Sequence, residues 1–265
     1  MNTTVFVGGG RITSALVAGL RRSGHQGVIV VHDRNAEKLR ALERDFGIAA
    51  EPDLQSAVAR ADLLIVAVRP AAVAKVLQAI AGCTGASRLL MVSLAAGIPL
   101  KQLRPRLGSR VRWARALPSP ICRIGRGLTA VTFARNLPRG DRKRVRKFFE
   151  QVGPVLEMPE SRFDAFNAAY SPGHGYHALA TLAKAAQDAG LDGETALTAG
   201  AHALAEAIFY WRESGQKLSN LLQEAATPGG TTAATLAAMD AAGYARAIGR
   251  GIAAGIRQSR ANARR

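Results

Sequence analysis

VFVGGGRIT, the segment at residues 5–13, places three glycines between a short apolar run and a stretch with helical periodicity. A glycine turn between a strand and a helix lets main-chain N–H groups approach a pyrophosphate, because the helix N-terminus favours negative charge. Thr13 stands where such turns usually have glycine or alanine. The alternative for the glycines alone is a flexible turn without a ligand. The candidate dinucleotide-binding residues in this segment are Gly8, Gly9, Gly10, Arg11 and Ile12.

The rest of residues 1–160 alternates short β-rich runs with amphipathic stretches, which is the pattern of βαβ units and a parallel sheet. Leu63–Val68 is an unbroken apolar run, typical of a strand buried on both faces. Further strands are expected at 28–31, 89–94, 111–116 and 129–133, and helices at 12–23, 35–46, 72–81 and 141–152. We therefore predict an α/β domain over residues 1–160, with a doubly wound parallel sheet of the Rossmann type.

Residues 161–265 have a different character, because alanine becomes frequent and β-branched runs disappear. Apolar residues recur there at helical spacing, as in Leu197, Ala201, Leu204, Ile208 and Trp211. Glycine-containing breaks predict about five helices, the first over Phe163–Asp188 with a kink at Pro172-Gly173. We predict an all-α C-terminal domain that buries its apolar face against a second copy, giving a homodimer or a larger homo-oligomer.

The formal charge of +17 is unevenly distributed. Residues 1–160 hold 26 of the 36 Lys and Arg residues and 11 of the 19 Asp and Glu residues. No stripe of interleaved aromatic residues accompanies them, so we expect no specific nucleic-acid partner. The favoured interpretation is a solvated surface that attracts an anionic cofactor, and the alternative is a polyanion-binding role.

Two cysteines, Cys83 and Cys122, supply no disulfide framework and fit a reducing compartment. The N-terminus lacks the basic region of a signal peptide, and no apolar run reaches the ~18 residues of a membrane span. We therefore expect a cytoplasmic protein without membrane association.

Asp33 and Arg34 lie at the end of the second predicted strand, where dinucleotide-binding folds contact the adenosine ribose. A carboxylate there accepts hydrogen bonds from the ribose hydroxyls of NAD, whereas an arginine can bind the 2′-phosphate of NADP. The alternative role of Asp33 is to cap the helix that begins near Ala36. The expected cofactor is NADPH or NADH, and the basic surroundings favour NADPH.

The segment ATPGGTT at residues 226–232 opens the later of two predicted helices. Glycines at a helix start expose consecutive N–H groups, and the two hydroxyls that follow complete a cradle for a carboxylate. The alternative is an ordinary turn between helices with Thr231 as the N-cap residue.

Taken together, these segments resemble the pyrroline-5-carboxylate reductase family over residues 4 to about 260. That family's glycine loop, its AVKP and AAGI segments and its SPGGTT helix start have counterparts in the same order. The counterparts are Gly8–Thr13, Ala67-Val68-Arg69-Pro70, Ala95-Ala96-Gly97-Ile98 and Thr227–Thr232.

The resemblance implies hydride transfer from the nicotinamide to the imine carbon of 1-pyrroline-5-carboxylate, a small anionic cyclic imine, giving L-proline. It implies that Thr232 is catalytic, with its hydroxyl facing the ring nitrogen. A cyclic imine is protonated near neutral pH, so the reaction needs orientation and desolvation more than a strong general acid. The further cofactor-binding residues that it implies are Ala67, Val68, Arg69, Pro70, Ala95 and Ala96, and the substrate-binding residues of the late turn are Thr227, Gly229, Gly230, Thr231 and Thr232.

Two segments depart from the family pattern. Residues 118–121 are PSPI where the family has PNTP, and residues 170–176 are YSPGHGY where it has SGSGPAY. Ser119 and Gly173 remain substrate-binding candidates. His174 and His177 have no partner at metal-ligand spacing, so no metal site is expected, and their alternatives are helix packing or proton donation near the imine. The departures leave two rival hypotheses: a reductase of a different cyclic imine, or a non-catalytic protein that binds a dinucleotide or a polyanion.

Overall fold

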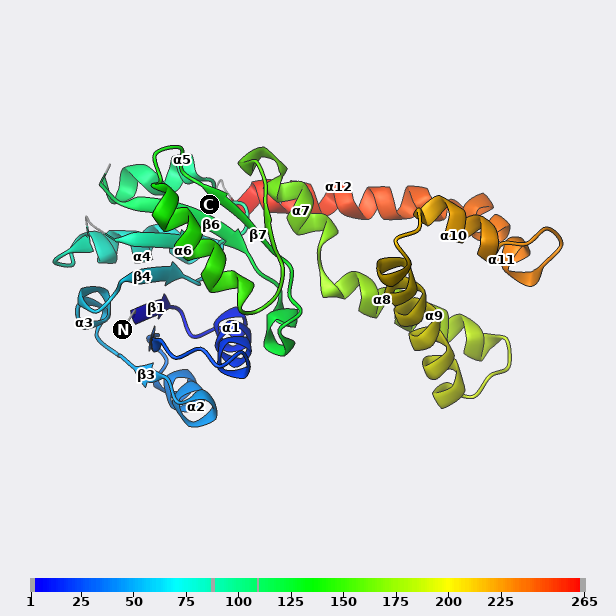
Figure 1. The fold of residues 1–265 in the computed structure, drawn as a ribbon, viewed down its shortest axis with the longest axis horizontal. Coiled ribbons are helices and arrows are strands. Elements are labelled where there is room, and N and C mark those ends of the chain that lie inside the picture. The colour runs from blue at the N-terminus through cyan, green and yellow to red at the C-terminus, as the bar shows by residue number, and fades with distance from the viewer. Residues whose placement is uncertain (1–2, 87–88, 109, 263–265) are drawn as a thin grey trace. The chain divides into compact units, whose positions relative to one another are not determined.

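The computed structural model describes residues 3–86, 89–108 and 110–262 (Figure 1). The chain folds into two compact units, Met1–Ala169 with Gly255–Arg265, and Tyr170–Ala254. A short helical stretch after residue 160 and the end of the last helix thus belong to the first unit. The predicted domain boundary after residue 160 stays a prediction.

The first unit is built on an eight-stranded sheet with the order β3-β2-β1-β4-β5-β6-β7-β8. Neighbouring strands are parallel except for β6 and β7, which are antiparallel. The predicted doubly wound parallel sheet is confirmed, apart from this one antiparallel pair, which was not predicted. The strands are β1 (Thr3–Val7), β2 (Val28–His32), β3 (Ala49–Ala50), β4 (Leu63–Val66), β5 (Leu90–Ser93), β6 (Arg112–Leu117), β7 (Thr129–Phe133) and β8 (Val155–Glu157). The short edge strands β3 and β8 were not predicted. The expectation that the central strand continues to Val68 is wrong, because β4 ends at Val66 and the next residues form a loop.

Helices cover both faces of this sheet. They are α1 (Arg11–Arg22), α2 (Ala36–Phe46), α3 (Leu54–Ala59), α4 (Pro70–Ala81), α5 (Leu100–Leu103), α6 (Arg139–Glu150) and α7 (Phe163–Ala169), with short 3-10 turns η2 (Arg104–Arg106), η3 (Pro120–Ile124) and η4 (Glu160–Arg162).

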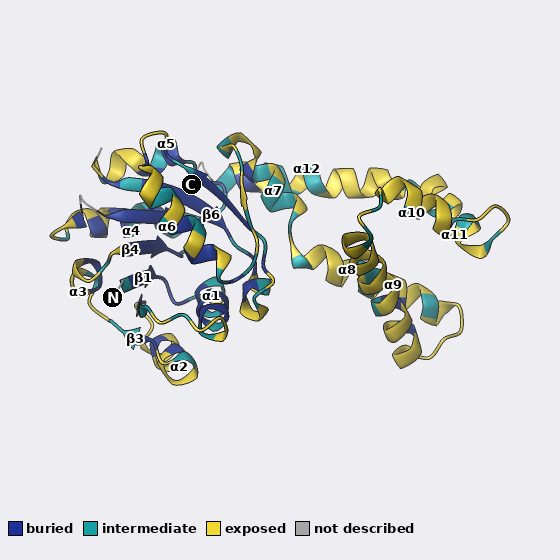
Figure 2. Cartoon of the chain, viewed as in Figure 1, coloured by how far each residue is buried: buried dark blue, intermediate teal, exposed yellow. Residues whose placement is uncertain are grey.

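The core of the first unit follows from the alternation of side chains along each strand. Leu63 and Ile65 of β4 face the core shared with α1, α2 and α6, whereas Leu64 and Val66 face the core shared with α4 and α5. Each of the four is at most 2% exposed. Burying a side chain of this kind contributes about 1.5–3 kcal/mol, so the central strands anchor the loops at their carboxyl ends. Figure 2 shows the buried sheet between helices whose outer faces are exposed.

The second unit is helical throughout the residues described. It contains α8 (Pro172–Asp188), α9 (Gly193–Ser214), α10 (Leu218–Ala225), α11 (Thr231–Ala241) and most of α12 (Tyr244–Asn262). The expected single helix over 163–188 is wrong, because α7 ends at Ala169 and α8 begins anew at Pro172. Ser171 is the N-cap of α8, and its hydroxyl accepts the Gly173 N–H at 3.2 Å. Because Ser171 precedes a proline, the helical backbone conformation is disfavoured at this residue, and the helix is interrupted there.

Helix α9 is largely exposed in the single chain (Figure 2), and large apolar side chains are among its exposed residues. Ile208 is 55% exposed, Phe209 59% and Trp211 43%. Exposed apolar surface of this kind marks an interaction site rather than a solvent-facing surface.

Candidate functional site

The glycine turn between β1 and α1 is held against the neighbouring strand. Gly8 has φ +112° and donates its N–H to the His32 carbonyl at 2.8 Å. A Cβ on Gly8 would lie 2.7 Å from the Ala67 carbonyl oxygen, so only glycine fits there. Gly10, by contrast, is the N-cap of α1 and faces open space, and no side chain caps this helix end. The first N–H groups of α1 are therefore available to an anion.

Thr13 contributes to the turn, although it departs from the usual glycine or alanine. Its side chain is completely buried, and its hydroxyl donates to the Gly8 carbonyl at 2.5 Å. The hydroxyl thus ties the first turn of α1 to the start of the glycine turn.

Asp33 also holds this turn. One carboxylate oxygen accepts the Gly9 N–H at 2.7 Å, and the other accepts the Asn35 N–H at 2.9 Å. The alternative in which Asp33 caps α2 is wrong, because Asn35 is the N-cap and its side chain accepts the Lys38 N–H at 3.1 Å. Two of the roughly four acceptor positions of the Asp33 carboxylate are therefore used by the main chain.

A cavity of about 640 Å³ opens beside these groups. It lies at the carboxyl ends of β1, β2 and β4, where open α/β sheets bind their ligands. Four basic residues line it, Arg34, Lys38, Arg69 and Lys75, and none of them has an ion-pair partner in the described part of the chain. Asp33 is its only acidic lining residue among those described. The cavity is therefore suited to an elongated ligand with several negative charges.

The structure brings most of the predicted cofactor residues to this cavity. Those that line it are Gly8, Gly10, Asp33, Arg34, Ala67, Val68 and Arg69. The predicted residues that do not appear in its lining are Gly9, Arg11, Ile12, Pro70, Ala95 and Ala96. The Gly9 N–H donates to the Asp33 carboxylate. Arg11 is the first residue of α1 and Pro70 the first residue of α4, whereas Ala95 and Ala96 lie in the loop after β5.

Sequence reasoning missed the remaining lining residues, which are Val7, His32, Lys38, Leu54, Ala71, Ala72, Lys75, Val76 and Ala79. The residues of α4 carried a usable signal, because Ala71, Ala72, Lys75, Val76 and Ala79 recur with the three- to four-residue spacing of one helix face. Lys38 lies one turn into α2, close in sequence to Arg34. Leu54 begins α3, a helix that was not predicted.

The loop between β5 and α5 continues the same edge of the sheet. The Ala67 N–H donates to Val7 of β1 at 2.9 Å, and the Leu94 N–H donates to Val66 of β4 at 3.0 Å. Ala95, which follows, is 2% exposed. The glycine turn, the Ala67 loop and the Ala95 loop are thus successive loops on neighbouring strands.

Ser119 follows β6 and is 3% exposed. Its hydroxyl oxygen accepts the Ile121 N–H at 3.1 Å and so caps η3. The nearby Cys122 is buried, and burial raises the pKa of its thiol. Burial thus disfavours the thiolate, which is the nucleophilic form of the side chain.

The late glycine turn lies in the second unit. Gly229 has φ +78°, and the Gly230 N–H donates to the Thr227 carbonyl at 2.9 Å. Thr231 is not the N-cap, contrary to the alternative; Gly230 is, and no side chain caps α11. The exposed Thr231 and Thr232 therefore begin a helix whose first N–H groups are open to a ligand, as a carboxylate cradle requires.

The two remaining candidates for substrate contact lie apart in the chain. Gly173 is in the first turn of α8, in the same unit as the late glycine turn, and Ser119 is in the first unit. His174, Tyr176 and His177 on α8 are exposed. Within the described residues, no group of three metal-ligating side chains occurs, and no helix is long and apolar enough to cross a bilayer.

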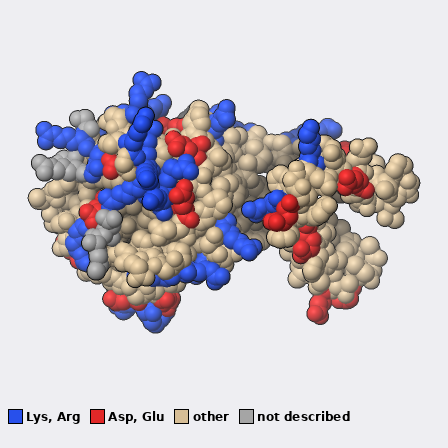
Figure 3. All heavy atoms as spheres, viewed as in Figure 1, with Lys and Arg blue, Asp and Glu red and all other residues tan. Residues whose placement is uncertain are grey.

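Basic side chains also gather on α6, on the face of the first unit that Figure 3 shows. Some have acidic partners: Arg146 lies 3.3 Å from Glu150 and 3.6 Å from Glu157, and Arg112 of β6 pairs with Asp141 at 2.8 Å. This surface is convex helix rather than cavity, and it fits the interpretation of a solvated basic surface.

The fold and the basic cavity define a dinucleotide-dependent oxidoreductase with a separate helical unit. Comparison with family models agrees: residues 3–97 match the family described as NADP oxidoreductase, coenzyme F420-dependent, and residues 160–262 match the family described as pyrroline-5-carboxylate reductase dimerisation. The chain belongs to the pyrroline-5-carboxylate reductase family.

Individual relatives support this assignment. A pyrroline-5-carboxylate reductase of Corynebacterium melassecola is 29% identical over 92% of each chain, and one of Mycobacterium leprae is 32% identical over 72% of this chain and 66% of its own length. The solved 1-pyrroline-5-carboxylate reductase of Streptococcus pyogenes has a TM-score of 0.89 at 22% identity, covering 98% of both chains. A Plasmodium falciparum pyrroline carboxylate reductase solved with NADP bound has a TM-score of 0.88 at 20% identity, covering 99% of this chain and 98% of its own.

Proposed function

We propose that this chain reduces 1-pyrroline-5-carboxylate to L-proline with a reduced nicotinamide dinucleotide. Two features of this family member carry the proposal. One is a cavity at the glycine turn lined by four basic side chains that form no ion pair with the described residues, and the other is a glycine-rich start of α11 that no side chain caps. The names of the relatives favour this activity over the alternatives of a different cyclic imine and a non-catalytic binding protein.

The residues of the cavity fit a dinucleotide. A Cβ at Gly8 would strike the Ala67 carbonyl, whereas Gly10 leaves open space at the N-terminus of α1. The pyrophosphate is assigned to this N-terminus, where the first N–H groups and the helix dipole favour it. When bound, the cofactor supplies a hydride from its nicotinamide ring.

NADPH is the proposed preferred cofactor. The Asp33 carboxylate accepts two main-chain N–H groups, so only about half of its acceptor positions are left for ribose hydroxyls. Arg34 and Lys38 line the cavity next to it without acidic partners among the described residues, and a guanidinium binds a phosphate through paired hydrogen bonds. The 2′-phosphate would therefore meet two basic side chains that form no ion pair within the described part of the chain.

The protein's part in the chemistry is orientation. Reduction adds a hydride to the imine carbon while the ring nitrogen keeps its proton, so a protonated C=N bond becomes CH–NH. The N–H groups of Thr231 and Thr232 are proposed to hold the substrate carboxylate, and the Thr232 hydroxyl to face the ring nitrogen. The Gly230 N–H, a third predicted donor, already donates to the Thr227 carbonyl. Ser119 and Gly173 are proposed to contact the substrate. Holding both reactants in reactive geometry is enough to account for much of the acceleration, because the substrate is already activated by protonation.

We also propose that two copies associate through the helical unit, because its large apolar side chains are exposed in the single chain. A cytoplasmic location and the absence of nucleic-acid and membrane partners stay predictions.

A spectrophotometric assay tests the proposed activity. Oxidation of NADPH or NADH on addition of 1-pyrroline-5-carboxylate, with proline formed in equal amount, is expected. If neither cofactor is oxidised by a protein that binds NADPH, proline formation is not its reaction. Oxidation with piperideine carboxylates alone would instead assign a different imine.

A further inference from the structure

Arg115 is a charged residue in the middle of the buried sheet. It lies on β6 and is 3% exposed. Its guanidinium donates to Glu160 at 2.8 Å and to the Ala95 carbonyl at 3.5 Å, and its central carbon lies 4.9 Å from the centre of the Phe163 ring. Its Nε is buried with no hydrogen-bond partner in the described part of the chain.

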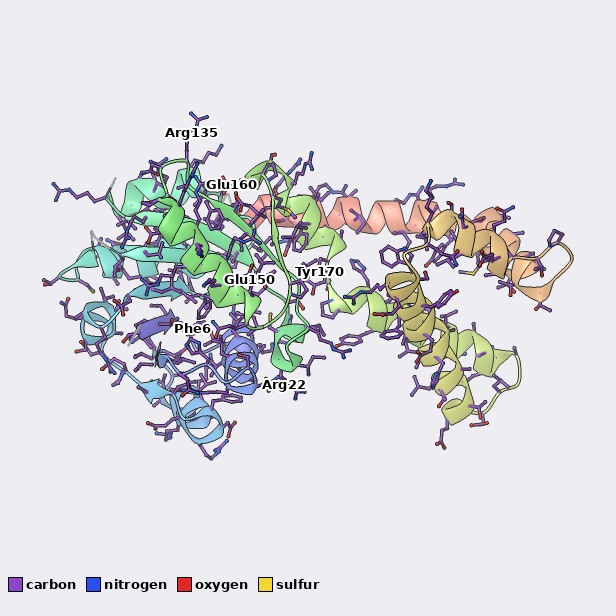
Figure 4. The ribbon with its side chains drawn as sticks, in the orientation of Figure 1. Phe6, Arg22, Arg135, Glu150, Glu160 and Tyr170 are labelled. Carbon is purple, nitrogen blue, oxygen red and sulfur yellow. The ribbon has the colours of Figure 1, made fainter. Side chains whose placement is uncertain are left out.

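Glu160 connects Arg115 to the far end of the loop at residues 95–100, which begins with Ala95. The carboxylate oxygen that pairs with Arg115 also accepts the Leu100 N–H at 2.7 Å, and Leu100 is the first residue of α5. Residues 95–100 are therefore held at both ends by one ion pair. Figure 4 labels Glu160, which belongs to η4 just before α7.

The middle of the loop is fixed by a third contact. Gly97 has φ +80°, and any Cβ there would strike the Ser259 carbonyl of α12. The Ser259 hydroxyl donates to Asp164 of α7 at 2.7 Å. The end of α12 thus packs closely on the loop, in the same compact unit.

Stability alone is a poor reason for this arrangement. Burial removes the hydration of the Arg115 charge, which is 3% exposed, while Glu160 keeps 30% of its side chain exposed. Apolar side chains of similar volume are often as stabilising as a buried charge. What the pair provides is a defined geometry for two specific main-chain groups, the Ala95 carbonyl and the Leu100 N–H.

We propose that Arg115 is a positioning residue for the nicotinamide half of the cofactor, acting through Glu160 on the loop at residues 95–100. This rests on the proposed function and on the cofactor contacts that the family resemblance implies for Ala95 and Ala96, which follow β5 and are outside the cavity lining. The sheet order supports this proposal. The cavity is lined at the ends of β2, β1 and β4, which are neighbours in that order, and β5 is the next strand after β4. The loop that follows β5 therefore continues the row of loops that line the cavity.

The test compares two ligands across the wild type, three test variants and one control variant of the full chain. NADPH carries the nicotinamide, whereas 2′,5′-ADP is its adenosine half alone. Binding of both is measured by calorimetry for the wild type, Arg115→Met, Arg115→Lys and Glu160→Asp, with melting temperatures as a check of folding. Glu160→Asp keeps both charges but shortens the side chain, so a single oxygen no longer reaches both Arg115 and Leu100. Arg112→Met is the matched control, because Arg112 is an ion-paired arginine on the same strand whose partner is Asp141.

In Arg115→Met, NADPH binding is expected to weaken about fivefold or more. Binding of 2′,5′-ADP, whose site is distant, should stay within about twofold. The kcat should fall by roughly a hundredfold, as misplacement by about 1 Å does in other enzymes. Arg115→Lys should recover part of the kcat, Glu160→Asp should show the same selectivity more weakly, and Arg112→Met should match the wild type.

Equal weakening of both ligands in Arg115→Met and Glu160→Asp would mean that Arg115 has only a structural role. Unchanged NADPH binding and kcat in both variants would show that the loop does not depend on it. The binding comparison requires no imine, so it decides the role of Arg115 even if the wild type fails to reduce 1-pyrroline-5-carboxylate.

Discussion

Replacing Arg34 by glutamine tests the assignment of the 2′-phosphate. Arg34 is exposed at the cavity edge and unpaired among the described residues, so its loss should leave the fold and the glycine turn unchanged. A hydrogen bond to a charged group contributes about 1.5–3 kcal/mol, which corresponds to roughly ten- to hundredfold in affinity. The lower end is expected, because Lys38, Arg69 and Lys75 remain and exposed charges are screened by salt.

The assay is steady-state kcat/KM for NADPH and for NADH at low ionic strength. The NADPH value should fall about tenfold in Arg34→Gln, whereas the NADH value should change by less than about twofold. Arg40→Gln, on an exposed position of α2 outside the cavity, is the control and should change neither. Equal losses with NADPH and NADH, or a wild type that prefers NADH, would refute the assignment.

Three further substitutions probe the two glycine turns. Gly10→Val places a side chain in the space left for the pyrophosphate and should abolish binding of NADPH by calorimetry; unchanged affinity would mean that the turn is misassigned. Thr13→Val removes the hydrogen bond to the Gly8 carbonyl and leaves that carbonyl without this donor. The unfolding free energy, measured by denaturant titration, should fall by about 1–3 kcal/mol, and cofactor binding should weaken. No change in either quantity would show that the bond is dispensable. Thr232→Ala should lower kcat much more than NADPH affinity, and parallel losses of both would argue against its place at the imine.

The sheet could be predicted because its central strands are unbroken apolar runs that only a two-sided core explains. The four residues of β4 are such a run, and the glycine turn after β1 supplies the motif. The edge strands β3 and β8 are only two and three residues long, too short to give a periodic signal. The break between α7 and α8 could have been predicted from Ser171-Pro172, which is a typical pair of an N-cap residue and a first helical residue. It was missed because the residues on both sides have helical periodicity.

The candidate site was predictable where the motif is local and ambiguous where contacts are distant. The sequence placed Asp33 and Arg34 at the ribose, yet it could not show that Asp33 holds Gly9, because that bond joins residues 24 positions apart. The pairing of Arg115 with Glu160 spans 45 positions and has no periodic pattern. An arginine flanked by alanines in the interior of β6 was its only trace in the sequence.

The account depends on hydride transfer to the imine, and an isotope experiment tests that step directly. The enzyme is incubated with 1-pyrroline-5-carboxylate and, in turn, each of the two NADPH epimers deuterated at the nicotinamide C4, and the proline is analysed by mass spectrometry and NMR. One epimer should place a single deuterium on the former imine carbon of L-proline, and the other should leave it undeuterated. Proline without deuterium from both epimers, or no proline at all, would contradict the account.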